Sequence, residues 1–258
     1  HQTVTATGRL SSVSPNLHNI PVRTEKGKVF REVFVAQNNH RLLVADYNQI
    51  ELRCIAHLSS DPGLINAFND GQDIHTATAA QVFGVNDADV TKAQREKAKM
   101  VSYGLAYGME AYGLAQRLGI ENKEAAKILN DYFSAFPSVK EYMDKAVNQA
   151  KEKGFTETLF GRKRKIPELK SSNSRVRGAA ERQAMNAGIQ GLAADIFKVA
   201  LVNLNKRLKD DNLDSAIILQ VHDEVILECP MDELAHAKEL TLAEMESAFD
   251  LKVPLEVH

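Results

Sequence analysis

The chain has little of what marks several specialised classes of protein. Its 258 residues contain two cysteines, no tryptophan and seven prolines. Cys54 and Cys229 stand in apolar contexts without a CxxC pair, so they predict reduced core thiols of a cytosolic protein, not a zinc site or a disulfide framework. We find no apolar run approaching the roughly 18 residues of a membrane span, no signal peptide, no repeat and no low-complexity tract.

An excess of charge of one sign is also missing. Lys+Arg 32 against Asp+Glu 34 gives a formal net charge of −2. This balance neither demands nor excludes nucleic acid, because a local basic stripe is enough to bind it. A chain of this length can bury one large core or two smaller ones. Because it opens on His1 rather than Met, we expect an excerpt of a longer protein.

The predicted elements are mixed at both ends of the chain and helical in the middle. A polar, turn-rich stretch with a strand at 29–36 comes first, and a buried strand at 41–47 leads into a helix at 49–59. Six helices are expected within 63–153, then a hairpin at 155–165. The remaining elements are a helix at 176–207 with an irregularity at Gly188 or Gly191, a strand–turn–strand unit around Asp223, a helix at 231–249 and a strand at 253–257. A helical insertion on an antiparallel sheet predicts the α+β class better than a βαβ alternation does.

Two acids stand where apolar strands are expected to end. Asp46 follows the apolar run 42–45, and Asp223 lies between the runs 216–219 and 225–227. Nucleotidyl transfer with two divalent ions needs carboxylates near metals about 3.5–4 Å apart, and Mg²⁺ usually takes only one or two of them. The alternative is that Asp46 caps the next helix and Asp223 occupies a hairpin turn.

A stripe of two cations and two aromatic rings recurs every fourth residue of one predicted helix. It consists of Arg95, Lys99, Tyr103 and Tyr107. Helix N-termini already favour anions, so cations in this half suggest a polyanion such as a triphosphate, and the rings could stack on a sugar and base. Gly104 and Gly108, each costing about 1 kcal/mol of helix propensity, fit the close approach of a flat ligand. The alternative is a solvated basic face followed by two core aromatics.

Together these segments resemble the polymerase motifs of family A DNA polymerases, the bacterial DNA polymerase I group. The matching stretches follow the expected order and span nearly the whole chain: 5–12, 15–17, 46–53, 73–75, 95–108, 186–195 and 220–224. Asn48 departs from a common Ser, Met100 and Ser102 from a common Ala and Asn, and Tyr103 from a Phe in many members. None of these departures removes a metal or phosphate ligand of the family.

The resemblance implies a right-hand polymerase without its thumb. The palm, an antiparallel sheet with helices, would comprise residues 1–55 and 178–258, and the all-helical fingers residues 56–177. We expect the thumb to precede His1 and the family's chain to continue past His258. Such a fragment should bind primer-template weakly and with low processivity.

The implied reaction is template-directed DNA synthesis, in which dNMP from a dNTP is added to a primer 3′-OH and pyrophosphate is released. The implied cofactor is Mg²⁺, two ions, which Mn²⁺ can replace. The implied partners are primer-template DNA and dNTPs, with no membrane, and the chain would be a monomer. We expect it in the bacterial cytoplasm with the nucleoid, in replication and repair.

The resemblance also assigns roles residue by residue. Asp46, Asp223 and the backbone carbonyl of Tyr47 would hold the metal ions, and Lys99 would join the two acids in catalysis by protonating the pyrophosphate. The nucleotide-binding residues would be Arg95, Lys99 and His75 at the triphosphate, Tyr103 stacked on sugar and base, Glu51 blocking a ribose 2′-OH, and Gln49. The DNA-binding residues would be Arg9, Tyr107, Arg182, Asn186, Gln190 and His222.

Each assignment has a simpler alternative. Glu51 could be a solvated helix residue, His75 a capped surface histidine, and Asn186 and Gln190 an exposed helical pair. The basic run 162–165 could track DNA phosphates or form a solvated face. At the level of function, the alternatives are a catalytically silent DNA-binding relic and a single-subunit RNA polymerase. The intact ligands argue against the former and Glu51 against the latter.

Overall fold

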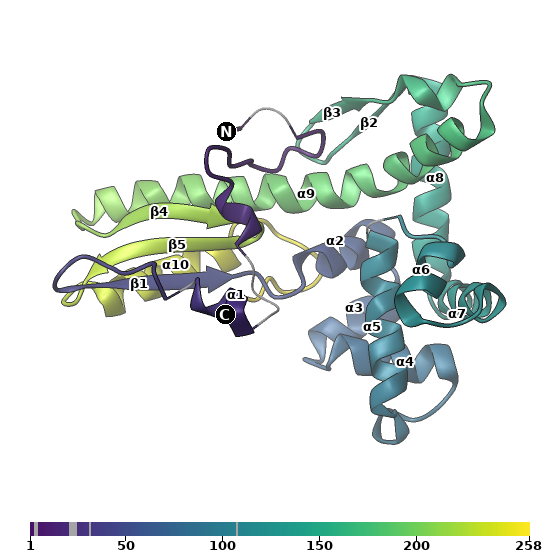
Figure 1. Cartoon of the computed structure of the whole chain (residues 1–258), viewed down its shortest axis with the longest axis horizontal. Coiled ribbons are helices and arrows are strands. Elements are labelled where there is room, and N and C mark those ends of the chain that lie inside the picture. Colours follow the sequence, from purple (N-terminus) through teal and green to yellow (C-terminus); the bar gives the residue numbers. More distant parts are fainter. Residues whose placement is uncertain (3–4, 21–24, 31, 107) are drawn as a thin grey trace. The chain divides into compact units, whose positions relative to one another are not determined.

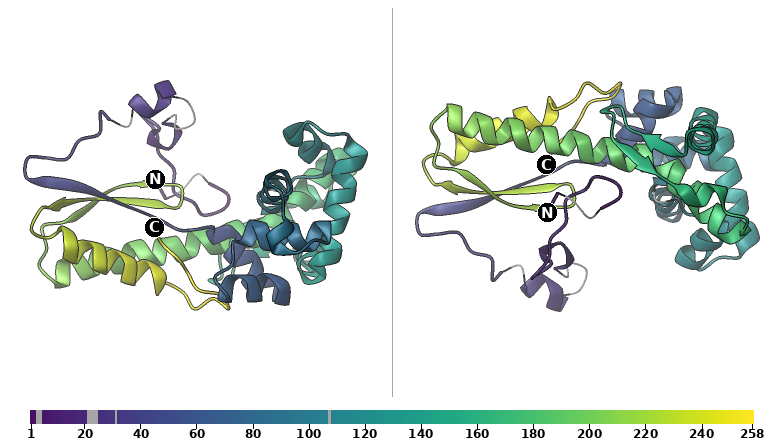
Figure 2. Two further views of the ribbon diagram at one scale, coloured as in Figure 1. Left: turned by 90° about the horizontal axis from the view of Figure 1, so that it is seen from below. Right: turned by 90° about the horizontal axis from the view of Figure 1, so that it is seen from above.

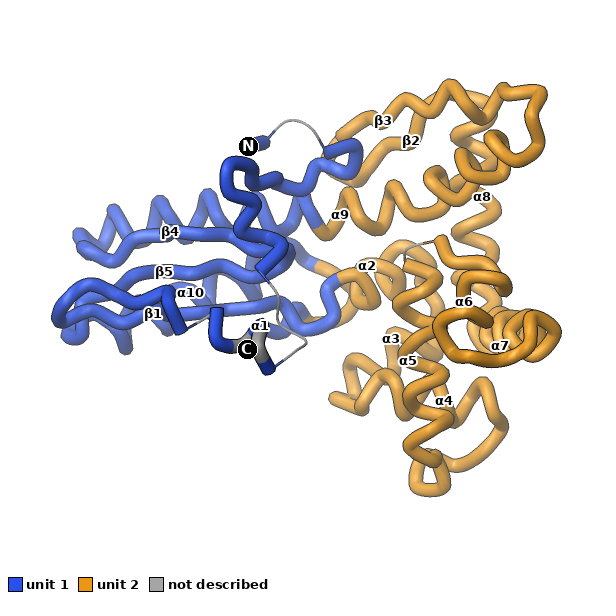
Figure 3. The backbone as a smooth tube through the Cα atoms, viewed as in Figure 1, with its two compact units in different colours: residues 1–50, 194–250, 255–258 blue, residues 51–193, 251–254 orange. Residues whose placement is uncertain are grey.

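The chain forms two compact units, each built from separate stretches of sequence. The structure is a computed structural model that describes residues 1–2, 5–20, 25–30, 32–106 and 108–258. Unit 1 comprises residues 1–50, 194–250 and 255–258, and unit 2 comprises residues 51–193 and 251–254 (Figure 3). Both contain helices, and each has one small antiparallel sheet, which confirms the predicted α+β class.

Unit 1 is organised around a three-stranded antiparallel sheet (Figure 1). Its strands are β1 (His40–Asp46), β5 (Glu224–Pro230) and β4 (Ala216–Val221), in that spatial order. β1 and β5 pair over their whole length, from His40 opposite Pro230 to Asp46 opposite Glu224. This register fixes which side chains share a face, because successive residues of a strand point to opposite sides.

One face of this sheet is packed against helices. Figure 2 shows α10 (Leu234–Glu246) and the C-terminal half of α9 (Ser174–Asp210) on the same side of the sheet. The apolar side chains that fill this core include Ala45, Val225, Leu227, Ile196, Phe197, Leu204 and Met245. Tyr47 anchors the end of β1 here, since its hydroxyl donates to the Met245 carbonyl at 2.6 Å and its ring meets Phe197 edge-on.

The start of unit 1 differs from the prediction. The strand expected at 29–36 does not form in the described residues of that stretch: Val29 ends α1 (Glu25–Val29), and residues 32–36 are irregular. Val33 and Val35 are 69% and 78% exposed. Their β-branched side chains favour a strand, but a strand is stable only when a neighbour pairs with it. A 3-10 helix, Leu17–Asn19, precedes this region.

The end of the chain is also less regular than predicted. The expected strand at 253–257 is reduced to one bridge between Tyr47 and Val257. The backbone of Asp46 and that of His258 exchange two hydrogen bonds, at 2.9 and 3.0 Å, so the end of the chain still supports the end of β1.

Unit 2 is mostly helical, as predicted. Its helices are α2 (Ile50–Ser59), α3 (Pro62–Asn69), α4 (Ile74–Phe83), α5 (Lys92–Ala106), α6 (Ala111–Leu118), α7 (Asn122–Ala135), α8 (Pro137–Lys153) and the first part of α9. The first residue of α2, Ile50, still belongs to unit 1. Two 3-10 helices, Asp87–Asp89 and Pro167–Lys170, lie between them. The hairpin predicted at 155–165 is present as β2 (Phe155–Glu157) and β3 (Lys163–Lys165).

The helix α9 is longer and more regular than the prediction. It runs unbroken over 37 residues, so the irregularity expected at Gly188 or Gly191 is wrong. Gly188 has a packing role instead, because the Tyr142 hydroxyl occupies the space that a Cβ at this position would need. An 18-residue window of α9 has a mean hydropathy of 1.3, so by length and composition alone this helix could cross a membrane. From the sequence we expected no such stretch. Since 61% of that window is buried inside the protein, α9 has the character of a core helix.

Candidate active site

Two carboxylates, from segments far apart in the sequence, lie at one end of the unit 1 sheet. Asp46 is the last residue of β1 and stands opposite Glu224, the first residue of β5. Asp223 directly precedes Glu224, in the turn between β4 and β5. The Tyr47 amide donates to the Asp223 carbonyl at 3.2 Å. The proximity that a shared metal site requires is therefore a consequence of strand pairing.

The environment of both acids disfavours their negative charge. Asp46 is exposed as a residue, yet partial burial of its carboxyl group raises its pKa, and the Asp223 charge raises it further. Burial also raises the pKa of Asp223, against the opposing effects of Arg9 and His222. Adjacent carboxylates with raised pKa values are a favourable site for a cation.

The donor set fits a divalent cation of the magnesium type. Within the described residues, no group of three or more His, Cys, Asp or Glu side chains is arranged to hold a metal. Asp46 and Asp223 supply two carboxylates, and the Tyr47 amide bonds to the Asp223 backbone beside them. Mg²⁺ commonly binds through one or two carboxylates and completes its shell with water and substrate phosphates, so this small set is sufficient.

Basic and imidazole groups surround Asp223. The Arg9 Nη2 atom lies 3.7 Å from the Asp223 Oδ1 atom, and both side chains are about one-quarter exposed. His222 is held at φ 55° in the turn, and its ring lies 5.6 Å from that of His18. The His18 Nε2 atom lies 2.9 Å from the Gln220 carbonyl oxygen. Sequence reasoning missed His18, since nothing in its local pattern indicates a partner near residue 220.

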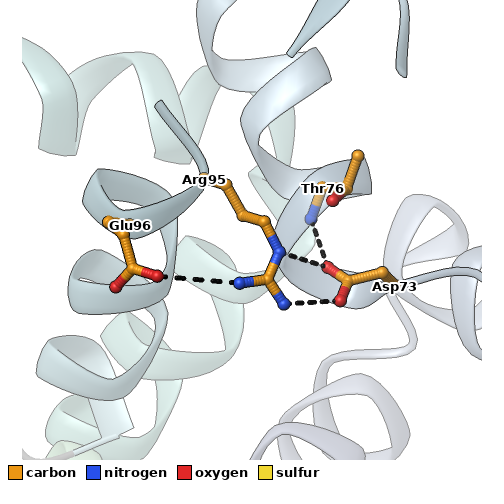
Figure 4. A network of polar contacts seen from close by, with 4 residues as sticks. All are labelled: Asp73, Thr76, Arg95 and Glu96. Atoms are coloured by element: carbon orange, nitrogen blue, oxygen red, sulfur yellow. Dashed lines mark hydrogen bonds and ion pairs between the residues drawn. The ribbon is translucent and has the colours of Figure 1, made fainter. Parts of the chain in front are cut away.

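A second group of candidate residues lies in unit 2, on α4 and α5. Arg95 donates from Nε to Asp73 Oδ1 at 3.2 Å and from Nη2 to Asp73 Oδ2 at 2.6 Å (Figure 4). This two-point contact lowers the pKa of Asp73 to about 2 and raises that of Arg95. Asp73 was noted in the sequence only as part of a matching motif, and the pairing assigns it a partner.

His75 is a buried member of the same group. It is only 2% exposed, so the alternative of a capped surface histidine is wrong. Burial lowers its pKa to about 4; the charge of Asp73 opposes this shift, and those of Arg95 and Lys99 add to it. In the part of the chain that the structure describes, its buried Nδ1 atom has no hydrogen-bond partner. Its ring lies 5.5 Å from that of Tyr103, which places the first turn of α4 beside α5.

The fourth member of the predicted stripe, Tyr107, lies outside the described residues. The first three, Arg95, Lys99 and Tyr103, all lie on α5. Lys99 is partly buried, and its charge acts on His75 together with that of Arg95. The helix therefore presents cations near the buried His75. The alternative of a purely solvated basic face does not predict this arrangement.

The predicted DNA-binding residues of α9 lie against the end of α5. Asn186 is 6% exposed and donates to the Arg182 carbonyl at 3.0 Å, while Gln190 donates to the Ala106 carbonyl at 3.2 Å. The alternative of an exposed helical pair is therefore wrong. Gly108, at φ 72°, lies so close to the Asn186 amide that a Cβ could not fit. Arg182 is ion-paired with Glu110 at 2.9 Å.

The remaining nucleotide-binding candidates stand at the start of α2. Glu51 is 5% exposed, in the first turn of the helix, which rules out the solvated-residue alternative. Gln49 adopts φ 56° immediately before the helix and is partly buried. Acidic side chains are seldom this deeply buried, so the position of Glu51 is compatible with a specific role.

Comparison with known proteins identifies the family. The model of DNA polymerase family A matches residues 1–258. The chain belongs to DNA polymerase family A. It is 54% identical over 256 residues to DNA polymerase I of Caldicellulosiruptor bescii, 50% over 258 to that of Geobacillus stearothermophilus and 51% over 257 to that of Pseudomonas aeruginosa. These alignments cover 99–100% of this chain and 28–30% of each relative, so the chain spans under one-third of the family A proteins it matches.

A solved family A structure agrees with the fold. The POL domain of Pol1 from M. smegmatis, in complex with DNA primer-template and dNTP, is similar with a TM-score of 0.95 and 50% sequence identity. The similarity covers 100% of this chain and 46% of that one. The resemblance inferred from the sequence motifs is therefore confirmed at the level of family and fold.

Proposed function

We propose that the chain carries the nucleotidyl-transfer site of a DNA-directed DNA polymerase. In this reaction the primer 3′-oxygen bonds to the α-phosphorus of a dNTP, the bond to the β-phosphate bridging oxygen breaks, and pyrophosphate leaves. The observation that carries the proposal is the pairing of β1 with β5, which brings Asp46 and Asp223 to one end of a sheet. The names of the relatives, DNA polymerase I, and of the structural neighbour support it.

We infer that the two sequence parts of the palm are residues 1–55 and 178–258, with residues 56–177 as the fingers. The division of the chain into two compact units, with changes of unit at residues 50 and 193, supports two such bodies. The inferred second boundary, at residue 178, and the observed change of unit, at residue 193, both fall inside α9. A continuous helix gives no local signal of a boundary, which explains why the two differ.

In the proposed palm, Asp46, Asp223 and the Tyr47 carbonyl would hold two Mg²⁺ ions, which Mn²⁺ could replace. When bound, these ions supply positive charge to the reacting phosphate and its attacking oxygen. Without such charge, burial raises the pKa of both acids, and the Asp223 charge raises that of Asp46 further. Arg9 and His222, beside Asp223, would contact the primer end of the DNA.

In the proposed fingers, Arg95, Lys99 and His75 would bind the triphosphate. The buried Nδ1 of His75 has no hydrogen-bond partner among the described residues, and a phosphate oxygen that reached it would supply one. Lys99 would donate a proton to the departing pyrophosphate. Tyr103 would stack on the incoming sugar and base.

Further contacts would come from the proposed palm. Glu51 with Gln49 would select against a ribose 2′-OH. Arg182, Asn186 and Gln190 would contact the template and the minor groove.

Primer extension with the 258-residue chain and Mg²⁺ tests the proposal. We expect dNTP incorporation at high enzyme concentration and low salt. Asp223→Ala should abolish incorporation while fluorescence anisotropy shows nearly unchanged primer-template binding, because the side chain serves chemistry and not DNA affinity. Asp210→Ala, an exposed acid at the end of α9, is the matched control and should retain full activity.

Three outcomes would contradict this assignment. Equal loss of synthesis and DNA binding in Asp223→Ala would make the acid structural. No incorporation by the wild-type chain above the Asp223→Ala background would overturn the catalytic function. Preference for rNTP over dNTP in competition would assign RNA synthesis instead.

A further inference from the structure

Asp73 contacts two different groups through a single carboxylate. Its Oδ1 atom accepts from the Thr76 amide at 2.7 Å, which caps the N-terminus of α4. The same oxygen accepts from Arg95 Nε, and Oδ2 accepts from Arg95 Nη2 (Figure 4). The acid therefore ties the guanidinium of α5 to the first turn of α4.

This contact leaves one edge of the guanidinium available. The Arg95 Nη1 atom faces away from Asp73 and forms an ion pair with Glu96 Oε1 at 3.7 Å, which is too long for a hydrogen bond (Figure 4). Its two N–H groups can donate to a phosphate oxygen without breaking the contact with Asp73. A guanidinium fixed along one edge presents the other edge in a defined direction.

Fixing Arg95 in advance should strengthen anion binding. An arginine side chain has substantial rotamer freedom, and binding through it loses less entropy when the side chain is already held. Burial is the main cause of the low pKa of His75, and the charge of Asp73 opposes the further lowering by Arg95 and Lys99, so Asp73 also offsets the positive charge of these two residues. The N-terminus of α4, a helix of 10 residues, adds its own preference for an anion.

We propose that Asp73 is a positioning residue that holds Arg95 beside the N-terminus of α4, ready to donate to a nucleoside triphosphate. The inference rests on the proposed function, which assigns Arg95 to the triphosphate but gives Asp73 no role. The competing explanation is that Asp73 serves only as the cap of α4.

Asp73→Asn separates the two roles. Asparagine caps a helix about as well as aspartate, so α4 should be retained, while the charge and one acceptor for Arg95 are lost. Asp61→Asn is the matched control, because Asp61 caps α3 through the amides of Gly63 and Leu64. Thermal unfolding of both variants shows whether either cap has been lost.

The first measurement is calorimetric binding of dATP and of inorganic tripolyphosphate to the 258-residue chain, without DNA or divalent ions. For Asp73→Asn we expect the Kd of both ligands to rise about 5- to 20-fold, as for a weakened charge-assisted contact. Asp61→Asn should leave both Kd values within about twofold. In primer extension, KM for dNTP should rise similarly while kcat changes little.

A double-mutant cycle with Arg95→Ala tests whether Asp73 acts through Arg95. If it does, Asp73→Asn should have no further effect on the Kd of tripolyphosphate in the Arg95→Ala chain. An unchanged Kd in the single Asp73→Asn variant, or equal effects with and without Arg95, would overturn the proposal. So would failure of the wild-type chain to bind tripolyphosphate.

The two proposals fail in distinguishable ways. Weaker tripolyphosphate binding by Asp73→Asn, in a chain that never extends a primer, would support the role of Asp73 and overturn the polymerase function. Normal primer extension with an unaffected KM would support the polymerase function and overturn the role of Asp73.

Discussion

The carboxylate pair of unit 1 and the cation group of unit 2 are assembled in different ways. Asp46 and Asp223 come together because the backbones of β1 and β5 pair in one register. Arg95, Asp73 and His75 come together through side chains of α4 and α5, which are consecutive helices. The first group therefore depends on the sheet, whereas the second depends on charge and on a few side-chain contacts.

The two groups also differ in how their surroundings affect ionisation. In unit 1, burial raises the pKa of both acids; the Tyr47 backbone opposes this at Asp46, Arg9 opposes it at Asp223, and nearby histidines oppose it at both. In unit 2, Arg95 holds the pKa of Asp73 at about 2, and burial keeps His75 neutral with a pKa of about 4. The first group has two carboxylates, which suit metal ions. In the second, Asp73 balances the charge of Arg95, and the nitrogen donors of Arg95 and Lys99 suit a polyphosphate.

After the loss of synthesis expected for Asp223→Ala, the largest expected effect concerns Lys99, on the cation side of this comparison. Lys99→Ala should lower kcat/KM for dNTP about 10²- to 10⁴-fold, because a proton donor and a phosphate contact are lost together. Lys99→Arg should keep most of the binding but lower kcat, since a guanidinium donates a proton poorly. Single-turnover incorporation separates the two steps.

Lys97→Ala is the control, since Lys97 lies on the same helix but pairs with Glu124 at 2.8 Å. It should leave incorporation unchanged. Full kcat in Lys99→Arg would show that Lys99 acts through charge alone.

The next effect tests the dependence of the carboxylate pair on the sheet. Leu227 is fully buried in the middle of β5, between Leu43 of β1 and Ile217 of β4. Leu227→Ala should lower the free energy of unfolding by about 2–5 kcal/mol, from lost burial and a residual cavity. Urea unfolding measures the loss, and activity per folded molecule should persist.

The control for this prediction lies on the exposed face of the same sheet. Val44 is 48% exposed, so Val44→Ala should cost less than about 1 kcal/mol. Equal losses for the two variants would mean that the sheet has no buried face.

The pH dependence of stability should differ in sign between the two groups. His75 has a pKa of about 4 in the folded protein against 6.5 for the free side chain, so the unfolded chain binds more protons in this window. Stability should therefore fall as the pH drops from 6.5 to 4, by up to about 3 kcal/mol. The raised pKa values of Asp46 and Asp223 act oppositely, since their contribution is lost as pH rises through those values.

Urea unfolding at pH 7 and pH 5 isolates the histidine contribution. His75→Gln should reduce the difference between the two pH values, because glutamine does not titrate. An unchanged difference would show that the pKa of His75 is the same in the folded and unfolded chains. With tripolyphosphate present, the wild-type chain should take up protons on binding, since a nearby anion raises the pKa of His75.

The sequence predicted those parts of the fold and site that depend on local patterns. The apolar run before Asp46 and the four-residue spacing from Arg95 to Tyr103 are visible in consecutive residues, and both predicted elements form. The strand at 29–36 was wrong because a strand needs a partner as well as suitable residues. The predicted break in α9 was wrong because Gly188 serves packing against Tyr142.

Contacts between distant residues could not be predicted in the same way. Nothing in the sequence indicates that Asp73 pairs with Arg95, 22 residues away, or that Arg9 lies by Asp223. The burial of Asn186 depends on the approach of Gly108, which the helical pattern around Asn186 does not contain. The motifs named the residues of the candidate site, and only the fold gave their partners.

The smallest expected effect concerns Tyr103, whose ring lies beside that of His75. By resemblance to the family, Tyr at this position goes with ready acceptance of dideoxynucleotides, so ddNTP and dNTP should compete nearly equally in single-nucleotide extension. Tyr103→Phe removes only the hydroxyl and should favour dNTP by about tenfold, the effect of one hydrogen bond. Tyr112→Phe, with the ring 70% exposed, should change nothing. Strong preference for dNTP by the wild-type chain would contradict the prediction. The preference between ddNTP and dNTP is expected to depend on the side chains of α4 and α5 and not on the carboxylate pair. The residual incorporation by Asp46→Asn should therefore show the same ddNTP-to-dNTP ratio as the wild-type chain.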